Sequence, residues 1–158
     1  MDCPACDRAL KSLTVGDLTV DVCDAGCAGI WFKKYEIRKV DEPTDALGEQ
    51  LLDIPQDPAL VVDQSKRYRC PSCTDGVVLM RHFWSVKREV TVDECPACGG
   101  IFLNGGELAR IRAEFPSEAA KEAAADAYFA RVADPMINAA RAFDHLGPHI
   151  AEPEPRAI

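Results

Sequence analysis

Eight cysteines carry the chemistry that this 158-residue sequence makes possible. They fall into two groups of four, and each group opens with a Cys-Pro-x-Cys turn. Such a turn presents two thiolates from one short loop, and two loops complete the tetrahedral shell of a structural zinc site. The two pairs are 16 residues apart in the first group and 21 in the second, enough for a β-hairpin that brings the loops together. The sequence therefore predicts two zinc ions (Zn2+) per chain, one held by Cys3, Cys6, Cys23 and Cys27 and the other by Cys70, Cys73, Cys95 and Cys98.

The first group departs from the general pattern, because three residues rather than two separate Cys23 from Cys27. We expect this loop to bulge and Gly26 to absorb the extra residue with a positive φ angle. Gly29 and Gly100 each lie two residues after the last cysteine of their group. We expect them to permit the turn that directs amide hydrogens toward sulfur.

The sequence is also compatible with two other functions of the cysteines, redox cycling and iron binding. A Cys-x-x-Cys pair can cycle between dithiol and disulfide, although thioredoxin-like pairs open a helix and these pairs adjoin predicted strands. Four thiolates also suit iron. The sequence has no His-Glu-x-x-His pattern, and Glu36 and Glu107 are placed to favour the first turn of a helix. We therefore predict no catalytic residues and no enzyme activity.

The cysteine groups lie in two copies of one module. From the last cysteine of each group, residues 27–37 align without a gap with residues 98–108. Residues 18–22 and, more loosely, 86–92 alternate between apolar and polar side chains, which predicts a strand between the cysteine pairs of each copy. A hairpin partner at 77–80, a short strand after each last pair and a short helix complete the expected module, a three-stranded zinc ribbon.

Two segments outside the modules differ in composition. Residues 41–65 contain three prolines, seven acidic residues and no basic residue, and they predict an acidic linker with one short helix. After the second ribbon, Ser117 can cap an alanine-rich helix that ends near residue 133, where Asp134-Pro135 supplies a stop and a new helix start.

The expected architecture is a small metal-bound α+β fold, with short antiparallel strands in two zinc ribbons and a C-terminal α-helical hairpin. Its segments are ribbon 1 at 1–40, the acidic linker at 41–65, ribbon 2 at 66–115, a helical region at 116–147 and a disordered tail at 148–158.

The net charge of -8 lies mainly outside the modules, since the linker alone contributes -7 and residues 66–112 carry +3. Residues in the second ribbon mix basic and aromatic character, as nucleic-acid surfaces do, but the formal -2 of a tetrathiolate zinc site reduces their net charge. We therefore predict a non-catalytic module that binds proteins by complementarity to a basic surface, with nucleic acid as the alternative partner. The basic and aromatic residues are Lys66, Arg67, Arg69, Arg81, Lys87 and Arg88 with Tyr68, Phe83 and Trp84.

Two further expectations concern assembly and location. Apolar positions at helical spacing in the helical region allow a homodimer through these helices. The sequence begins without the basic residues and apolar run of a secretory signal, and it has no stretch of about 20 apolar residues. We expect a soluble cytoplasmic protein, in which thiols bind metal rather than form disulfides.

The Cys-Pro-x-Cys turns, the later Cys-Pro-x-Cys-Gly-Gly-Ile and the following Gly-Glu-Leu resemble the transcription factor IIB-type zinc-ribbon family of small bacterial proteins. The resemblance is strongest at residues 70–110. Residues 3–40 resemble the same module, with Trp31 where the family often has tryptophan, but with Lys33-Lys34-Tyr35 in place of the usual acidic and glycine residues. The resemblance implies two tandem zinc ribbons and a loose association with transcription or nucleic acid.

Overall fold

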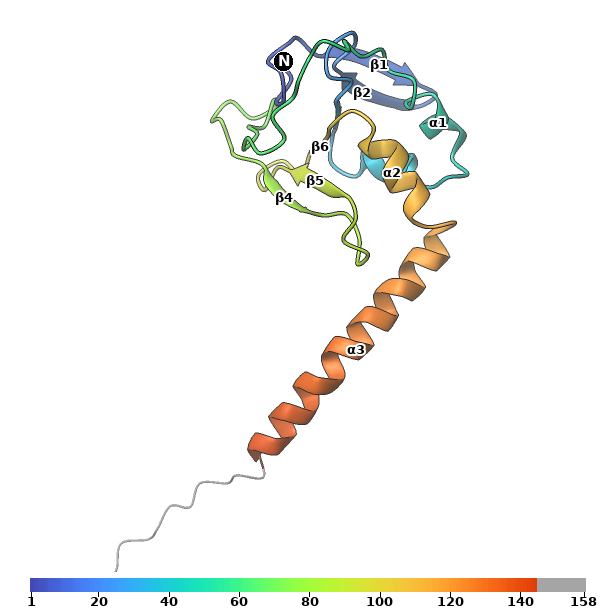
Figure 1. The fold of residues 1–158 in the computed structure, drawn as a ribbon, viewed down its shortest axis with the longest axis vertical. Helices are drawn as coiled ribbons and strands as arrows, with labels where there is room; N and C mark the ends of the chain where they lie inside the picture. The colour runs from blue at the N-terminus through green and yellow to red at the C-terminus, as the bar shows by residue number, and fades with distance from the viewer. Residues whose placement is uncertain (145–158) are drawn as a thin grey trace, which may run out of the picture.

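The structure, a computed structural model, describes the backbone of residues 1–144 and the side chains up to residue 133 together with Pro135 and Met136. Figure 1 shows a body of short strands and helices from which one long helix projects. The expectations for residues 145–158, which include the tail and the end of the helical region, lie outside this part of the chain.

Each cysteine module forms three antiparallel strands, as the sequence predicts. Each set of strands is followed by a short helix that begins at the aligned glutamate, η1 (Glu36–Lys39) in the first copy and α2 (Glu107–Glu114) in the second. Both strands predicted for the second hairpin lie later in the chain. The partner predicted at 77–80 is found at Met80–Phe83, and the strand predicted at 86–92 is found at Thr91–Glu94, because the chain from 84 to 90 forms the loop of the hairpin. The strands are β1 (Lys11–Val15), β2 (Leu18–Val22) and β3 (Ile30–Phe32), then β4 (Met80–Phe83), β5 (Thr91–Glu94) and β6 (Ile101–Leu103).

The strands of both modules belong to one continuous sheet, in the order β1-β2-β3-β6-β5-β4. The modules meet where β3 pairs antiparallel with β6, and Trp31 lies opposite Phe102, its own counterpart in the repeat. On either side of this central pair, Ile30 lies opposite Leu103 and Phe32 lies opposite Ile101. The repeat relates these two pairs to each other, because Ile30 corresponds to Ile101 and Phe32 to Leu103. An approximate two-fold axis therefore passes through the pair of Trp31 and Phe102.

The sheet separates two buried cores, because successive side chains of a strand point to opposite faces. Ile30 and Phe32 of β3 join an apolar core that α2 completes with Leu108 and Ile111. Trp31 and Phe102 instead pack with buried cysteines of both modules. One face of the sheet is thus an ordinary apolar core, and the other combines aromatic rings with thiols.

The acidic linker packs against the apolar core. It contains the expected short helix, α1 (Ala46–Glu49), and its Leu51 is 2% exposed while Leu47 is partly buried. Leu52, the third leucine of the predicted stripe, is exposed. The linker therefore contributes apolar side chains to the fold despite its seven acidic residues.

A buried arginine ties α2 to this linker. Arg112 is 4% exposed, and its guanidinium donates hydrogen bonds to the carbonyl oxygens of Val40, Pro43 and Asp45 at 2.7, 3.2 and 3.1 Å. It also donates to Glu49 at 2.7 Å. Because the planar guanidinium has five N–H donors, one side chain can satisfy several carbonyls in a loop that lacks regular pairing.

The C-terminal region differs from the predicted hairpin, because one helix, α3 (Glu118–Asp144), continues through Pro135. Its start is as expected, and the Ser117 hydroxyl accepts a hydrogen bond from the Ala120 amide at 3.2 Å. A proline inside a helix removes one hydrogen bond and crowds the carbonyl four residues back, which favours a kink. Here alanine-rich flanks with high helix propensity continue the helix on both sides. Neither α3 nor any other described helix is long and apolar enough to cross a membrane.

We expect Arg112→Met to lower the free energy of unfolding by about 2–4 kcal/mol, because it leaves three carbonyls without their donor at a buried site. Chemical denaturation followed by circular dichroism measures this loss. The matched control is Arg110→Met on the exposed side of α2, where a loss below about 1 kcal/mol is expected. Equal losses in the two variants would contradict the assigned role of Arg112.

Candidate metal centres

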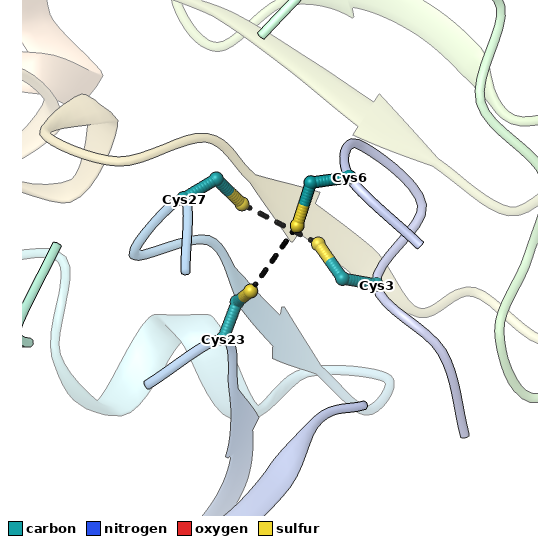
Figure 2. Close-up of side chains that lie close together, drawn as sticks. All are labelled: Cys3, Cys6, Cys23 and Cys27. Carbon is teal, nitrogen blue, oxygen red and sulfur yellow. Dashed lines mark hydrogen bonds between the residues drawn. The ribbon is translucent and has the colours of Figure 1, made fainter. Parts of the chain in front are cut away.

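The first four predicted cysteines converge from two loops of the first module. Figure 2 shows their sulfur atoms directed toward one another, Cys3 and Cys6 from the N-terminal turn and Cys23 and Cys27 from the loop between β2 and β3. The Sγ atoms of Cys3 and Cys27 are 3.4 Å apart, as are those of Cys6 and Cys23. All four lie within 4.8 Å of one another.

The second group forms an equivalent cluster. The Sγ atoms of Cys70 and Cys98 are 3.7 Å apart, and those of Cys73 and Cys95 are 3.8 Å apart. A tetrahedron with metal–sulfur bonds of about 2.3 Å has sulfur–sulfur edges of about 3.8 Å. Two sulfur–sulfur distances in the second cluster match this edge, and the two in the first cluster are slightly shorter. Both donor sets therefore fit a tetrahedral zinc ion, and no cysteine is in a disulfide.

The loop with the extra residue is built differently from the prediction. The positive φ angle belongs to Ala25, at 52°, and not to Gly26. Gly26 is needed for a different reason, because a Cβ at this position would overlap the sulfur of Cys23. The bulge is thus accommodated by a non-glycine residue in the left-handed region, and the glycine leaves space for the thiolate.

Gly29 and Gly100 also serve a purpose other than the predicted turn. The positive φ angles after the last cysteines belong to Ala28, at 56°, and Gly99, at 70°. A Cβ at Gly29 would lie 2.5 Å from the ring of Phe102, and one at Gly100 would overlap the ring of Trp31. Each glycine therefore makes room for an aromatic ring of the other module.

Hydrogen bonds between thiols shift their pKa values in opposite directions. The contact with Cys3 lowers the pKa of Cys27 to about 5, whereas the same contact, together with burial, raises the pKa of Cys3. Burial alone would raise the pKa of Cys95, but backbone hydrogen bonds from Cys98 and Ala97 contribute to lowering it to about 7. Each cluster thus supplies a thiolate near neutral pH, and the thiolate is the form that binds metal.

The two clusters differ in their access to solvent. In the first, Cys3, Cys23 and Cys27 are at most 2% exposed, and the loop from 23 to 27 is covered by the linker through hydrogen bonds with Pro55 and Asp57. In the second, Cys98 is exposed. Reagents that compete for metal or thiol therefore reach the second cluster more readily, because the most exposed cysteine of the first cluster, Cys6, is only partly exposed.

A family model for transcription factor zinc-fingers of the transcription factor IIB zinc-ribbon type matches residues 2–42 and 69–114, more than half of the chain. The chain belongs to this family. The two matched regions each contain one complete cysteine cluster, so the chain carries two tandem zinc ribbons. The searches of curated proteins and of solved structures found no significant match.

Family membership and cluster geometry together identify a zinc-binding protein with two zinc ions per chain. The eight cysteines are the residues that would hold the ions, four for each. Bound zinc supplies a structural cross-link between the two loops of a module, and a shell of four protein ligands leaves no open position for substrate. The chain's own contribution is to hold the thiolates together against their mutual repulsion.

A polar network beside the thiol-containing core was not evident in the sequence. The Tyr68 hydroxyl donates to the Asn104 side chain at 2.9 Å, and the Asn104 backbone amide donates to Glu107 at 2.7 Å. Burial raises the pKa of Glu107. In the first module the Lys33 amide donates to Glu36 at 2.9 Å in the same way. Both glutamates therefore hold the start of a helix, as the sequence predicts.

We expect Cys98→Ser to reduce the zinc content from two ions per chain to one, because a serine hydroxyl replaces one of four thiolates. Loss of the ion should unfold β4 to β6, since metal-binding energy is folding energy in so small a module. Elemental analysis and amide hydrogen exchange measure the two effects. Ala97→Ser, which adds a hydroxyl beside the site and keeps all ligands, should retain two ions; an unchanged zinc content in Cys98→Ser would show that Cys98 is not a ligand.

We also expect zinc to leave the native protein in two kinetic phases under a chelator or a thiol-modifying reagent, with the second cluster first. The reason is the exposure of Cys98 beside the burial of Cys3, Cys23 and Cys27. A zinc-sensitive dye follows the release. The fast phase should be missing in Cys98→Ser, and its persistence there would assign it to the first cluster instead.

Proposed function

We propose that the chain is a non-catalytic protein-interaction module, in which two zinc ribbons form a stable base and α3 presents a binding surface. The observation that carries this proposal is the exposure of apolar side chains along α3. Phe129 is 62% exposed, Met136 is 69% exposed and Val132 is 39% exposed. Their spacing of three and four residues places them along one side of the helix.

The projecting part of α3 lacks the burial that usually stabilises a helix in a protein. Every described side chain from Phe129 to Met136 is exposed, whereas most helical stability in proteins comes from packing of an apolar face. Exposed aromatic and methionine side chains of this kind are typical anchors for a helix that binds in a groove of another protein. A partner that covers this side of α3 would remove apolar surface from water.

The base of α3 is fixed to the body, so the surface is presented in a defined direction. The Lys121 ammonium lies 3.1 Å from Asp41, which is 8% exposed, and it stacks on the Trp84 ring at 4.8 Å from the centroid. Ser117 caps the first turn. These contacts come from the linker, the β4–β5 loop and the helix itself. A fixed direction lowers the conformational entropy lost on binding.

A nucleic-acid partner has less support, because the basic and aromatic residues do not all lie on one surface. Tyr68 is buried, and Arg81 stacks on it and pairs with the buried carboxylate of Asp93 at 3.0 Å. Lys66 and Arg69 lie near the Cys-Pro turns, whereas Phe83 and Trp84 lie at the β4–β5 hairpin. The net charge of -8 also opposes phosphate binding. We place the role in a reducing compartment such as the cytoplasm, where eight unpaired thiols retain metal.

Site-specific photocrosslinking in cells tests this role. A benzophenone amino acid at Phe129 should give a covalent adduct with a protein, because this position lies in the proposed surface. The matched control is Val61, an apolar linker residue that is 92% exposed and lies outside it. An adduct of twice the chain mass identifies a second copy as the partner, and another mass identifies a different protein. Absence of adducts from Phe129, or equal adducts from Val61, would refute the role.

A further inference from the structure

The loop after the last strand of the first module differs from its counterpart in the second. Lys33-Lys34-Tyr35 stands where the second module has Asn104-Gly105-Gly106. Tyr35 has a φ angle of 69°, in the left-handed region, and the equivalent Gly106 has one of 83°. Glycine adopts this region freely, whereas a residue with a Cβ is strained there. The first module therefore keeps a strained tyrosine at a position where its own repeat has glycine.

Burial does not compensate for this strain. In the second module the loop packs against the first, because Asn104 is 7% exposed and a Cβ at Gly105 would lie 2.5 Å from the Cys27 carbonyl oxygen. In the first module all three residues of the loop are exposed, and Tyr35 is 65% exposed. Strained residues are concentrated at active sites and ligand-binding sites. Tyr35 is therefore a candidate binding residue.

Two cations lie over the Tyr35 ring. The Lys34 ammonium is 4.9 Å from the ring centroid, and the Arg38 guanidinium is 6.0 Å from it. The Lys34 side-chain carbons also lie against Gly99, where a Cβ would be 2.9 Å from Cγ of the lysine. Among the described residues, no carboxylate forms an ion pair with Lys34 or Arg38. The ring thus holds two unpaired cations at the surface.

A cavity of about 570 Å³ lies beside this ring. Tyr35 and its two cations line the cavity together with apolar side chains from η1, β6 and the β4–β5 loop. These apolar residues are Ile37, Ile101 and Trp84. A ligand in the cavity can therefore contact apolar surface and both cations.

Four carboxylates of the described residues also line the cavity, and three of them already have partners. These contacts are Glu94 with His82 at 2.9 Å, and Asp41 and Glu118 with Lys121 at 3.1 and 3.2 Å. The fourth carboxylate is that of Glu42. The positive charge beside Tyr35 is therefore mainly available to a ligand, and residues 33–39 carry +3 in a chain with a net charge of -8.

These features fit a protein segment in which acidic residues flank a large apolar side chain. Its carboxylates can pair with Lys34 and Arg38, and its apolar side chain can enter the cavity. Nucleic acid fits less well, because a base that stacks on Tyr35 must displace a cation from the ring. The acidic linker also begins directly after the basic residues, so phosphates beyond the site meet negative charge.

We propose that Lys34, Tyr35, Arg38 and the adjacent cavity bind an acidic segment of a partner protein that carries a large apolar side chain. Tyr35 positions the two cations, and the cations bind the carboxylates. This contact rests on the protein-interaction role proposed above. It shares no residue with the exposed side of α3 at Phe129, so the two surfaces can be tested separately.

Fluorescence anisotropy of a labelled peptide with the repeat Asp-Glu-Leu tests this site in the full-length zinc-loaded chain. The control peptide has the repeat Asn-Gln-Leu, which keeps the apolar side chains and removes the charges. We expect the native chain to bind the acidic peptide at least about tenfold more tightly than the control peptide. Added salt should weaken this binding, because the ion pairs form at the surface.

Two substitutions separate binding from folding. Tyr35→Gly should weaken binding at least about tenfold, since it removes the ring that positions both cations. It should not lower the denaturant concentration at the midpoint of unfolding, because glycine relieves the strain of a positive φ angle. Arg38→Glu should weaken binding about as much. Arg67→Glu makes the same charge change at an exposed position outside the cavity, and it should change the affinity less than about twofold.

Several results would overturn the proposal. Equal affinity of the native chain and Tyr35→Gly shows that the ring takes no part in binding. Equal losses in Arg38→Glu and Arg67→Glu, or equal binding of the two peptides, show that the site does not recognise carboxylates. A lower unfolding midpoint in Tyr35→Gly shows that Tyr35 is a structural residue.

A nucleic-acid ligand is tested in the same assay. Oligothymidine that binds more tightly than the acidic peptide, and loses this binding in Tyr35→Gly, assigns the site to nucleic acid and overturns the proposal. Crosslinking from Phe129 should persist in Tyr35→Gly. Failure of this site is thereby distinguished from failure of the α3 surface.

Discussion

The antiparallel pairing of β3 with β6 is the contact on which the arrangement of the rest depends. It places Trp31 opposite Phe102, so each module sends one aromatic side chain across to the other. Glycines at 29 and 100 are required by these rings and not by local backbone conformation. Because the rings pack with thiols of both clusters, the two metal centres share one core.

This pairing also explains how so few large apolar residues stabilise a chain with two small modules. A ribbon of about 40 residues cannot bury enough surface alone, and it needs a metal or a partner. Here each ribbon has both, because zinc cross-links its loops and the neighbouring ribbon covers the edge of its last strand. The linker adds Leu51 and, through the hydrogen bonds of Arg112, is fixed against α2. Its acidic side chains meanwhile remain mainly at the surface.

Periodicity and spacing in the sequence were sufficient to predict the local features. The eight cysteines come together in the two predicted quartets, the three strands of each module form, and Glu36, Glu107 and Ser117 mark helix starts. Long-range features were not predictable in this way. The register of β3 on β6 depends on residues 71 positions apart, and the roles of Gly29 and Gly100 follow from that tertiary packing. The helix end predicted at Pro135 was wrong, because the high helix propensity of the flanking residues outweighs the local effect of the proline.

The approximate two-fold axis has a consequence for how such a chain can arise. When equivalent residues of two copies face each other, the contact is isologous, as in a symmetric homodimer. A single ribbon pairing with itself through the strand after its last cysteine would make the same contact that Trp31 and Phe102 make here. Duplication and fusion of its gene would retain that interface. The two halves could then change in sequence independently, whereas in a homodimer every change occurs in both subunits. One half could then lengthen its loop between Cys23 and Cys27, and the other could acquire α2 and α3.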